Sequence, residues 1–256
     1  MQKNYIEIKI ENQIGWIKIN REEKLNALNS SVLEELRENL INLRGNKKVL
    51  VLVITGSGNK AFVAGADIAE FSKHDKIKGL ELAKKGQENV LDLIENFQKP
   101  IIAGINGYAL GGGLELAMAC HLRIAVNDAK MGLPEVSLGL IPGYGGTQRL
   151  TKLVGKTNAM EIILTGEMID SKKALELKLV NKVVERKNLA SSITELAKKI
   201  MKNSPNAVEK AIASINAAEK NQKGFQVEKE KFSECFESKD FKEGVSAFLN
   251  KRKPNF

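Results

Sequence analysis

Residues 99–120 read KPIIAGINGYALGGGLELAMAC, and the rest of the sequence is organised around them. An apolar strand at 101–105 leads into three consecutive glycines and an apolar helix that carries one acid, Glu115. Glycines at a helix start lose backbone entropy, roughly 0.5–1 kcal/mol each against alanine, but leave the first-turn N–H groups open to a ligand. That terminus suits an oxygen that becomes negative during a reaction. Glu115 follows Gly112 by almost one helical turn, so we expect its carboxylate beside that terminus.

The same stretch also has a purely structural interpretation. A glutamate in a first helical turn often only complements the helix dipole. A dinucleotide site is disfavoured, because the glycines do not fit G-x-G-x-x-G and no acid follows at the spacing that a ribose contact needs.

The composition indicates a globular chain without a metal or disulfide framework. Its 256 residues are enough to bury a full core, as one large domain or one domain with an appendage. The N-terminal segment lacks the apolar region of a signal peptide, and we find no apolar run of about 18 residues. We therefore expect a soluble, cytoplasmic protein with no membrane partner. Two cysteines and two histidines offer little for a disulfide, a zinc site or a histidine-based triad.

The net charge of +9 admits three interpretations. It fits a nucleic-acid partner, a phosphate-bearing small molecule, or a solvated basic surface. Because the lysines are spread along the chain without interleaved aromatics, a solvated surface explains most of them.

Alternating strand and helix patterns extend from the N-terminus to about residue 185 and predict an α/β fold. Residues 5–10 and 16–20 read as a β-hairpin, and residues 49–55 as a strand buried on both faces. Ser31 to Glu34 reads as a capping box at the start of a helix that ends near Gly45.

Beyond residue 185 the pattern becomes helical. We expect helices at 187–202, 204–219, 221–236 and 240–252. This change of pattern divides the chain near residue 195 into a mixed core, 1–195, and a helical C-terminal region, 196–256.

Two further segments carry candidate functional residues. Small residues at 64–66 permit close approach of a ligand or another backbone, and Asp67 fits the cap of a following helix. Glu135 follows Pro134 in a stretch that is poor in acids. Read alone, residues 64–67 are an ordinary loop into a capped helix.

Taken together, three segments resemble the crotonase (enoyl-CoA hydratase/isomerase) superfamily. They are KAFVAGADI at 60–68, NGYALGGGLE at 106–115, and the run from Pro134-Glu135 through PGYGGTQRL at 142–150. The tail GVSAFLNKRK at 244–253 is also similar, so the resemblance covers essentially the whole chain. Leu114 and Met131 depart from the common cysteine and phenylalanine, and both changes are apolar.

The resemblance implies a spiral of ββα units with a helical C-terminal region that builds trimers, often paired into hexamers. It also implies a hydro-lyase closest to short-chain enoyl-CoA hydratases and 3-hydroxybutyryl-CoA dehydratases. Isomerases of the superfamily typically keep only one of the two acids, so the presence of both Glu115 and Glu135 favours a hydratase.

The resemblance also assigns the site. The N–H groups of Ala66 and Gly112 are expected to form the oxyanion hole, Glu115 to orient water as base, and Glu135 to deliver a proton to the α-carbon. The reaction needs neither a metal nor a separate cofactor, because coenzyme A is part of the substrate. The residues expected to bind the acyl-CoA substrate are Ala64, Ala66, Asp67, Ile68, Gly112, Pro142, Gly143, Phe248 and Lys251.

Three alternatives stay open. The first is an enoyl-CoA isomerase of the same fold. An RNA-binding protein on this fold would use the basic charge, but stacking aromatics are scarce, at 5% of the sequence. A glycosidase would use the two glutamates, but it leaves the glycine-opened helix unexplained.

Overall fold

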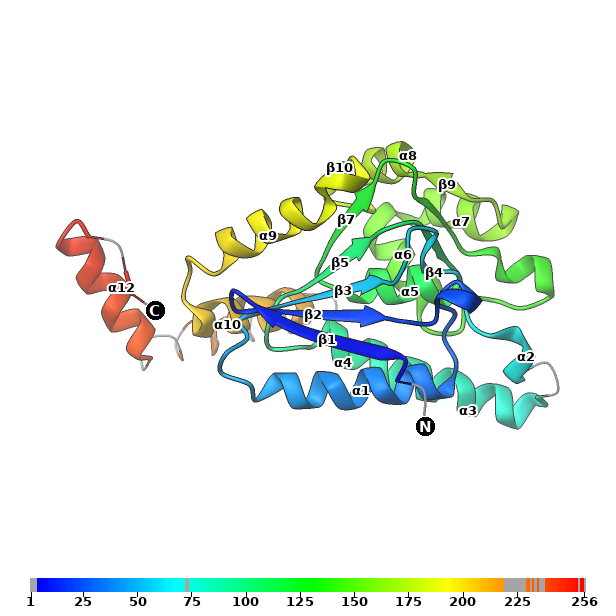
Figure 1. Ribbon diagram of the computed structural model, residues 1–256, viewed down its shortest axis with the longest axis horizontal. Helices are drawn as coiled ribbons and strands as arrows, with labels where there is room; N and C mark the ends of the chain where they lie inside the picture. The colour runs from blue at the N-terminus through cyan, green and yellow to red at the C-terminus, as the bar shows by residue number, and fades with distance from the viewer. Residues whose placement is uncertain are drawn as a thin grey trace.

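The computed structural model describes residues 4–71, 74–218, 229–230, 232, 234, 238–252 and 254–255. Two sheets organise this part of the chain (Figure 1). The predicted alternation of strands and helices is confirmed.

The main sheet has the order β1-β2-β3-β5-β7-β10. β1 and β2 form the predicted antiparallel hairpin, and the remaining neighbours pair in parallel. Its strands are Ile6–Glu11 (β1), Ile14–Ile19 (β2), Val51–Gly56 (β3), Ile101–Ile105 (β5), Leu122–Val126 (β7) and Lys182–Val184 (β10). The side chains of β5 and nearly all of those of β3 are buried, as expected for strands covered on both faces.

A second sheet of short strands, in the order β4-β6-β8-β9, lies beside the first. The strands are Ala61–Val63 (β4), Tyr108–Leu110 (β6), Lys130–Gly132 (β8) and Ile169–Asp170 (β9). The strands β3, β5 and β7 of the main sheet are each followed by a short strand of this second sheet. After β4 and β6 comes an α-helix, and after β8 a 3₁₀ helix. The ββα units implied by the resemblance are therefore present.

The helices connect and cover these strands (Figure 1). The α-helices are Ser30–Arg44 (α1), Ile68–Phe71 (α2), Lys76–Gly86 (α3), Asp92–Glu95 (α4), Gly112–Ala119 (α5), Gly146–Val154 (α6), Lys156–Thr165 (α7), Ser171–Glu176 (α8), Leu189–Ile200 (α9), Pro205–Ala217 (α10) and Lys239–Leu249 (α12). Shorter turns are the 3₁₀ helices Glu22–Lys24 (η1), Pro134–Leu138 (η3) and Arg186–Asn188 (η4), and the π-helical turn Gln87–Leu91 (η2).

The predicted capping box of α1 is wrong. The N-cap is Asn29, whose side chain accepts the N–H of Val32 at 2.9 Å, and Ser31 already lies inside the helix. An extended asparagine reaches the N–H three residues ahead as well as a serine does, so two candidate caps in succession leave the boundary ambiguous.

The predicted domain boundary near residue 195 falls inside helix α9. Ile193 and Ala197 of this helix are fully buried, and a side chain on Gly104 of β5 would collide with Ile193 at 2.7 Å. Helix α12 lies at the far end of the molecule from the sheets (Figure 1). The helix expected at 221–236 lies largely outside the described residues. The division into a core and an oligomerisation region stays a prediction.

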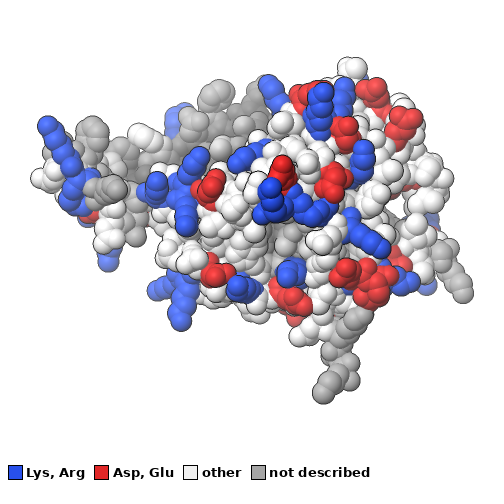
Figure 2. All heavy atoms as spheres, turned by 45° about the horizontal axis from the view of Figure 1, so that its top comes forward, with Lys and Arg blue, Asp and Glu red and all other residues white. Residues whose placement is uncertain are grey.

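Charged side chains are mixed over much of the surface. On the face in Figure 2, acidic and basic groups are interspersed over the core, and basic groups predominate toward the end that carries α12. Among the described helices, none is long and apolar enough to cross a membrane.

Candidate active site

The N-terminus of α5 is built from glycines that packing requires. Gly111, the N-cap, has a φ of 48°, which favours glycine. A side chain on Gly113 would collide with the carbonyl of Val63, so this glycine lets α5 pack against β4. At Gly112, by contrast, an added Cβ would meet its nearest neighbours at an ordinary 3.5 Å. Gly112 is buried, but a Cβ would fit there without displacing a neighbour, so packing does not require a glycine at this position.

Two N–H groups, that of Gly112 at this terminus and that of Ala66 in the neighbouring loop, have no hydrogen-bond acceptor among the described residues. Leu28 forms an isolated parallel β-bridge with Ala66. The Leu28 N–H donates to the carbonyl of Gly65 at 2.9 Å, and the Leu28 carbonyl accepts the N–H of Asp67 at 2.7 Å. Within the described part of the chain, neither the Ala66 N–H nor the Gly112 N–H donates a hydrogen bond. The preceding residues of the two loops are in contact, since a Cβ on Gly111 would lie 3.8 Å from the Gly65 Cα.

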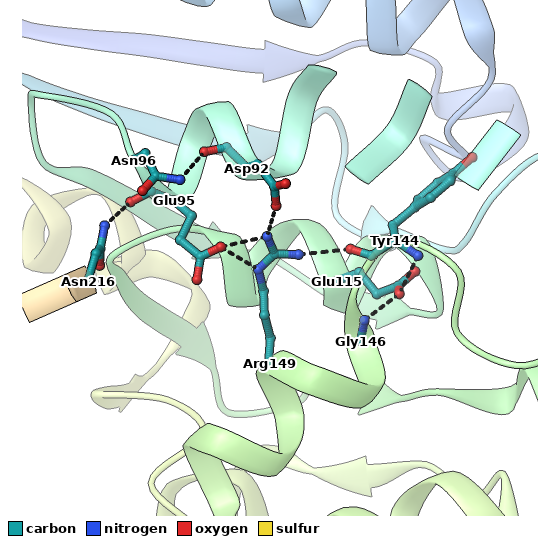
Figure 3. A network of polar contacts seen from close by, with 8 residues as sticks. All are labelled: Asp92, Glu95, Asn96, Glu115, Tyr144, Gly146, Arg149 and Asn216. Atoms are coloured by element: carbon teal, nitrogen blue, oxygen red, sulfur yellow. Dashed lines mark hydrogen bonds and ion pairs between the residues drawn. The ribbon is translucent and has the colours of Figure 1, made fainter. Parts of the chain in front are cut away.

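Glu115 is buried in the first turns of α5, with 2% of its surface exposed. Its Oε1 accepts the N–H of Tyr144 at 2.8 Å and that of Gly146 at 2.7 Å (Figure 3). Burial, with a further contribution from the Glu135 carboxylate, raises the pKa of Glu115 to about 7, although the two N–H donors oppose this. A carboxyl group with this pKa can take up or release a proton near neutral pH.

Glu135 lies in the first turn of η3 and faces the same terminus. Its Oε1 would be 2.8 Å from a Cβ on Gly111, and its Oε2 is buried without a hydrogen-bond partner among the described residues. Burial raises the pKa of Glu135. The structure thus brings Glu115 and Glu135 together around the start of α5.

Asp67 forms an ion pair that the sequence did not predict. Its Oδ2 accepts from Arg21 at 2.6 Å, and this hydrogen bond holds the pKa of Asp67 below its usual range. Arg21 also donates to the carbonyl of Ala27 at 3.1 Å. The expected capping contact is present as well, since Asp67 Oδ1 accepts the N–H of Ala69 at 3.3 Å. The Asp67 carboxylate therefore ties the loop that carries Ala66 to the segment after β2.

The other residues expected to bind substrate lie in two loops near these groups. Ala64 is half-buried and donates its N–H to the Leu25 carbonyl at 3.0 Å, whereas Ile68 is exposed. Pro142 is buried beside Gly146, and Gly143 is exposed with open space where a Cβ would stand. Both loops reach the surface close to Glu115 and Glu135.

Lys251 lies away from these residues within one chain. It is exposed and follows α12 directly in the sequence, and α12 lies far from α5 in Figure 1. Phe248 belongs to α12, but its side chain lies outside the described residues. One chain alone therefore does not bring Lys251 to the loops at 64–68.

Two cavities in the described part of the chain lie elsewhere. The larger, of about 380 Å³, is lined by residues such as Arg44, Lys99 and Asn206. The second, of about 350 Å³, lies between Asn96 and α10. Neither is lined by Glu115 or Glu135. In the described part of the chain, no group of three or more His, Cys, Asp or Glu side chains could hold a metal ion.

The sequence matches the family described as Enoyl-CoA hydratase/isomerase over residues 9–256. The chain belongs to this family. It is 42% identical to a short-chain-enoyl-CoA hydratase of Clostridium acetobutylicum, an alignment that covers 99% of this chain and 97% of that protein. It is also 42% identical to a crotonyl-CoA hydratase of Syntrophomonas wolfei, over 96% of this chain and 95% of that one.

A solved structure gives the same result for the fold. The enoyl-CoA hydratase of Bacillus anthracis superposes with a TM-score of 0.93 at 37% identity, and the match covers 99% of both chains. The predicted family and fold class are thereby confirmed.

Proposed function

We propose that this member of the enoyl-CoA hydratase/isomerase family is a hydro-lyase that adds water reversibly, with syn geometry, to a trans-2-enoyl-CoA and gives a 3-hydroxyacyl-CoA. The observation that carries the proposal is the pair of glutamates, the buried Glu115 and the half-buried Glu135, beside the N–H group of Gly112. The names of the two relatives support a short-chain substrate of the crotonyl-CoA type.

The chemistry divides among these groups. The thioester oxygen accepts from the N–H groups of Ala66 and Gly112, and each donor contributes ~2.7–4 kcal/mol as negative charge develops on that oxygen. Glu115 as carboxylate takes a proton from the water whose oxygen bonds to C3. Glu135 as acid gives its proton to C2, which preserves the proton count of the pair. In the dehydration direction both transfers reverse.

Two adjacent carboxyl groups suit this exchange. They resist ionising together, so the pair holds one proton over a range of pH. The pKa of about 7 for Glu115 fits a group that alternates between base and acid near neutral pH. Isomerisation needs only one acid–base group, so the second glutamate favours hydration over isomerisation.

We extend the proposal to assembly, coenzyme A binding and location. The loops at 64–68 and 142–143 hold the substrate beside the glutamates. Because α12 lies away from the site of its own chain, Phe248 and Lys251 reach coenzyme A from a neighbouring copy in a trimer or a dimer of trimers. The enzyme works in the cytoplasm without a cofactor, and nucleic acid is not its partner.

The test follows the absorbance of the enoyl thioester. With crotonyl-CoA, we expect the purified protein to abolish this absorbance, and mass spectrometry to identify the product as 3-hydroxybutyryl-CoA. The absorbance of longer 2-enoyl-CoAs should fall more slowly. Conversion of a 3-enoyl-CoA to a 2-enoyl-CoA without hydration would replace the hydratase by the isomerase. No reaction with any enoyl-CoA would contradict both.

A further inference from the structure

The turn that donates to Glu115 is held from its other side by a buried arginine. Arg149 donates through Nη1 to the carbonyl of Tyr144 at 2.8 Å (Figure 3). The backbone N–H of Tyr144 in turn donates to Glu115. A side chain on Gly145 would collide with the Arg149 guanidinium, and one on Gly146 would lie 2.8 Å from Glu115 Oε1. The turn 144–146 is therefore enclosed between the guanidinium and the carboxylate.

The guanidinium is itself held by α4. Its Nη2 forms ion pairs with Asp92 at 2.6 Å and with Glu95 at 2.7 Å, and its Nε donates to Glu95 at 3.2 Å. Only 7% of the Arg149 side chain is exposed. A rigid planar fork with three bonds to two carboxylates has little freedom to reorient.

A π-helical turn precedes these two carboxylates. The N–H of Asp92 donates to the carbonyl of Gln87, five residues earlier, so one extra residue enters the helix at this point. Such a turn rotates the residues that follow it relative to a regular α-helix, and it commonly occurs at functional sites. Asp92 and Glu95, three residues apart, both face Arg149.

We propose that Arg149 is a positioning residue for catalysis: it fixes the Tyr144 carbonyl, and through the turn 144–146 it holds the two N–H groups that orient Glu115. The expected effect on kcat rests on the proposed function. Arg149 itself is assigned no contact with substrate, because the guanidinium lies behind the turn.

Arg149 also acts on Glu115 through its charge. The charge state of Glu115 depends on the neighbouring titratable residues Glu135, Tyr144 and Arg149. Arg149 is itself paired with two carboxylates of α4, those of Asp92 and Glu95. The positive charge of Arg149 opposes the rise in the pKa of Glu115. Its removal leaves the α4 carboxylates uncompensated, so the pKa of Glu115 rises further.

Two substitutions separate position from charge. Arg149→Lys keeps the charge but loses the fork, so we expect kcat for crotonyl-CoA to fall roughly 10-fold with little change in KM or in the pH profile. Arg149→Met loses both, so we expect kcat to fall roughly 100-fold and the acidic limb of the profile to move to higher pH.

Arg123→Lys is the matched control. Arg123 is equally buried, but it donates to the carbonyls of Ala117, Cys120 and Leu179 at the opposite end of α5. This control should lower the melting temperature and leave kcat and the pH profile of the folded protein near wild type. The inference is overturned if both Arg149 variants, folded by circular dichroism, keep kcat within two-fold of wild type. It is also overturned if Arg123→Lys reproduces their kinetic losses.

A readout without turnover keeps this inference separate from the proposed function. The Glu115 carboxyl carbon is followed by NMR in protein labelled at the glutamate side-chain carboxyl, with its signal assigned by its loss in Glu115→Gln. A higher titration midpoint in Arg149→Met than in wild type and Arg149→Lys supports the inference, and equal midpoints in all three overturn it. Failure of the wild type to hydrate crotonyl-CoA would contradict the proposed function alone.

Discussion

The backbone N–H of Gly146 donates a 2.7 Å hydrogen bond to Oε1 of Glu115, which precedes it by 31 positions. A second donor, the N–H of Tyr144, binds the same oxygen at 2.8 Å. One carboxylate oxygen is therefore fixed by a distant turn. The other oxygen has no such bond to this turn and is the one we assign to the water.

Replacing either glutamate by glutamine should remove proton transfer while preserving shape. We expect Glu115→Gln and Glu135→Gln each to lower kcat by at least ~10²-fold. The double variant should lose much less than the product of the two, because the pair acts as a unit. The control is Glu161→Gln, on the exposed surface of α7, which should keep wild-type kcat. Near-normal hydration by either single variant would rule out its assigned role.

Glu115 should make the stability of the protein depend on pH. Its pKa is about 7 in the folded protein against an ordinary 4.5, so the folded state holds the proton more tightly. The stability that this proton provides is complete below pH 4.5 and is lost as the pH rises through 7. Glu115→Gln escapes the loss, so its free energy of unfolding relative to wild type should rise by about 2.5 kcal/mol from pH 5 to pH 8.

Urea unfolding of both proteins at the two pH values measures this difference. Apart from Glu135, whose titration is coupled to that of Glu115, the other titrating groups are common to the two proteins and largely cancel. An equal difference in stability at pH 5 and pH 8 would show that Glu115 titrates alike in the folded and unfolded states.

Two substitutions at Gly112 separate the loss of the N–H group from the addition of a side chain. Gly112→Pro removes the N–H at the first position of α5, where proline is tolerated in a helix, so turnover should be abolished while the fold largely survives. Gly112→Ala retains the N–H, and its Cβ has ordinary 3.5 Å contacts, so most of the activity should remain. A folded and active proline variant would show that this N–H does not bind the thioester oxygen.

Lys251 should act on binding alone if it contacts a phosphate of coenzyme A. Contacts remote from the reacting carbons stabilise substrate and transition state alike, so Lys251→Ala should raise KM with little change in kcat. Lys251 is exposed. A screened surface contact of about 1 kcal/mol corresponds to a roughly five-fold rise. Crotonyl-pantetheine, which lacks the phosphates, should show no such rise. An equal effect on both substrates, or on neither, would mean that Lys251 contacts no phosphate.

The sequence alone determined the alternation of strands and helices and the candidate glutamates. Long apolar strands such as residues 101–105 leave a clear local pattern, and a helix opened by Gly111 to Gly113 is visible without any partner. The three-residue strands β4, β6 and β8 escaped detection, because so few residues show no periodicity and pair only with strands distant in the sequence.

Only the tertiary structure decided how the glutamates are held. The N–H donors of Glu115 lie 29 and 31 positions away, and Arg149 binds carboxylates 54 and 57 positions away. Arg21 meets Asp67 across 46 positions. No local pattern marks such pairs, and the pKa of Glu115 depends on its burial, on the Glu135 carboxylate and on these N–H donors. Sequence thus identifies which groups are present, whereas packing decides their partners and charge states, because both depend on distances that only the folded chain creates.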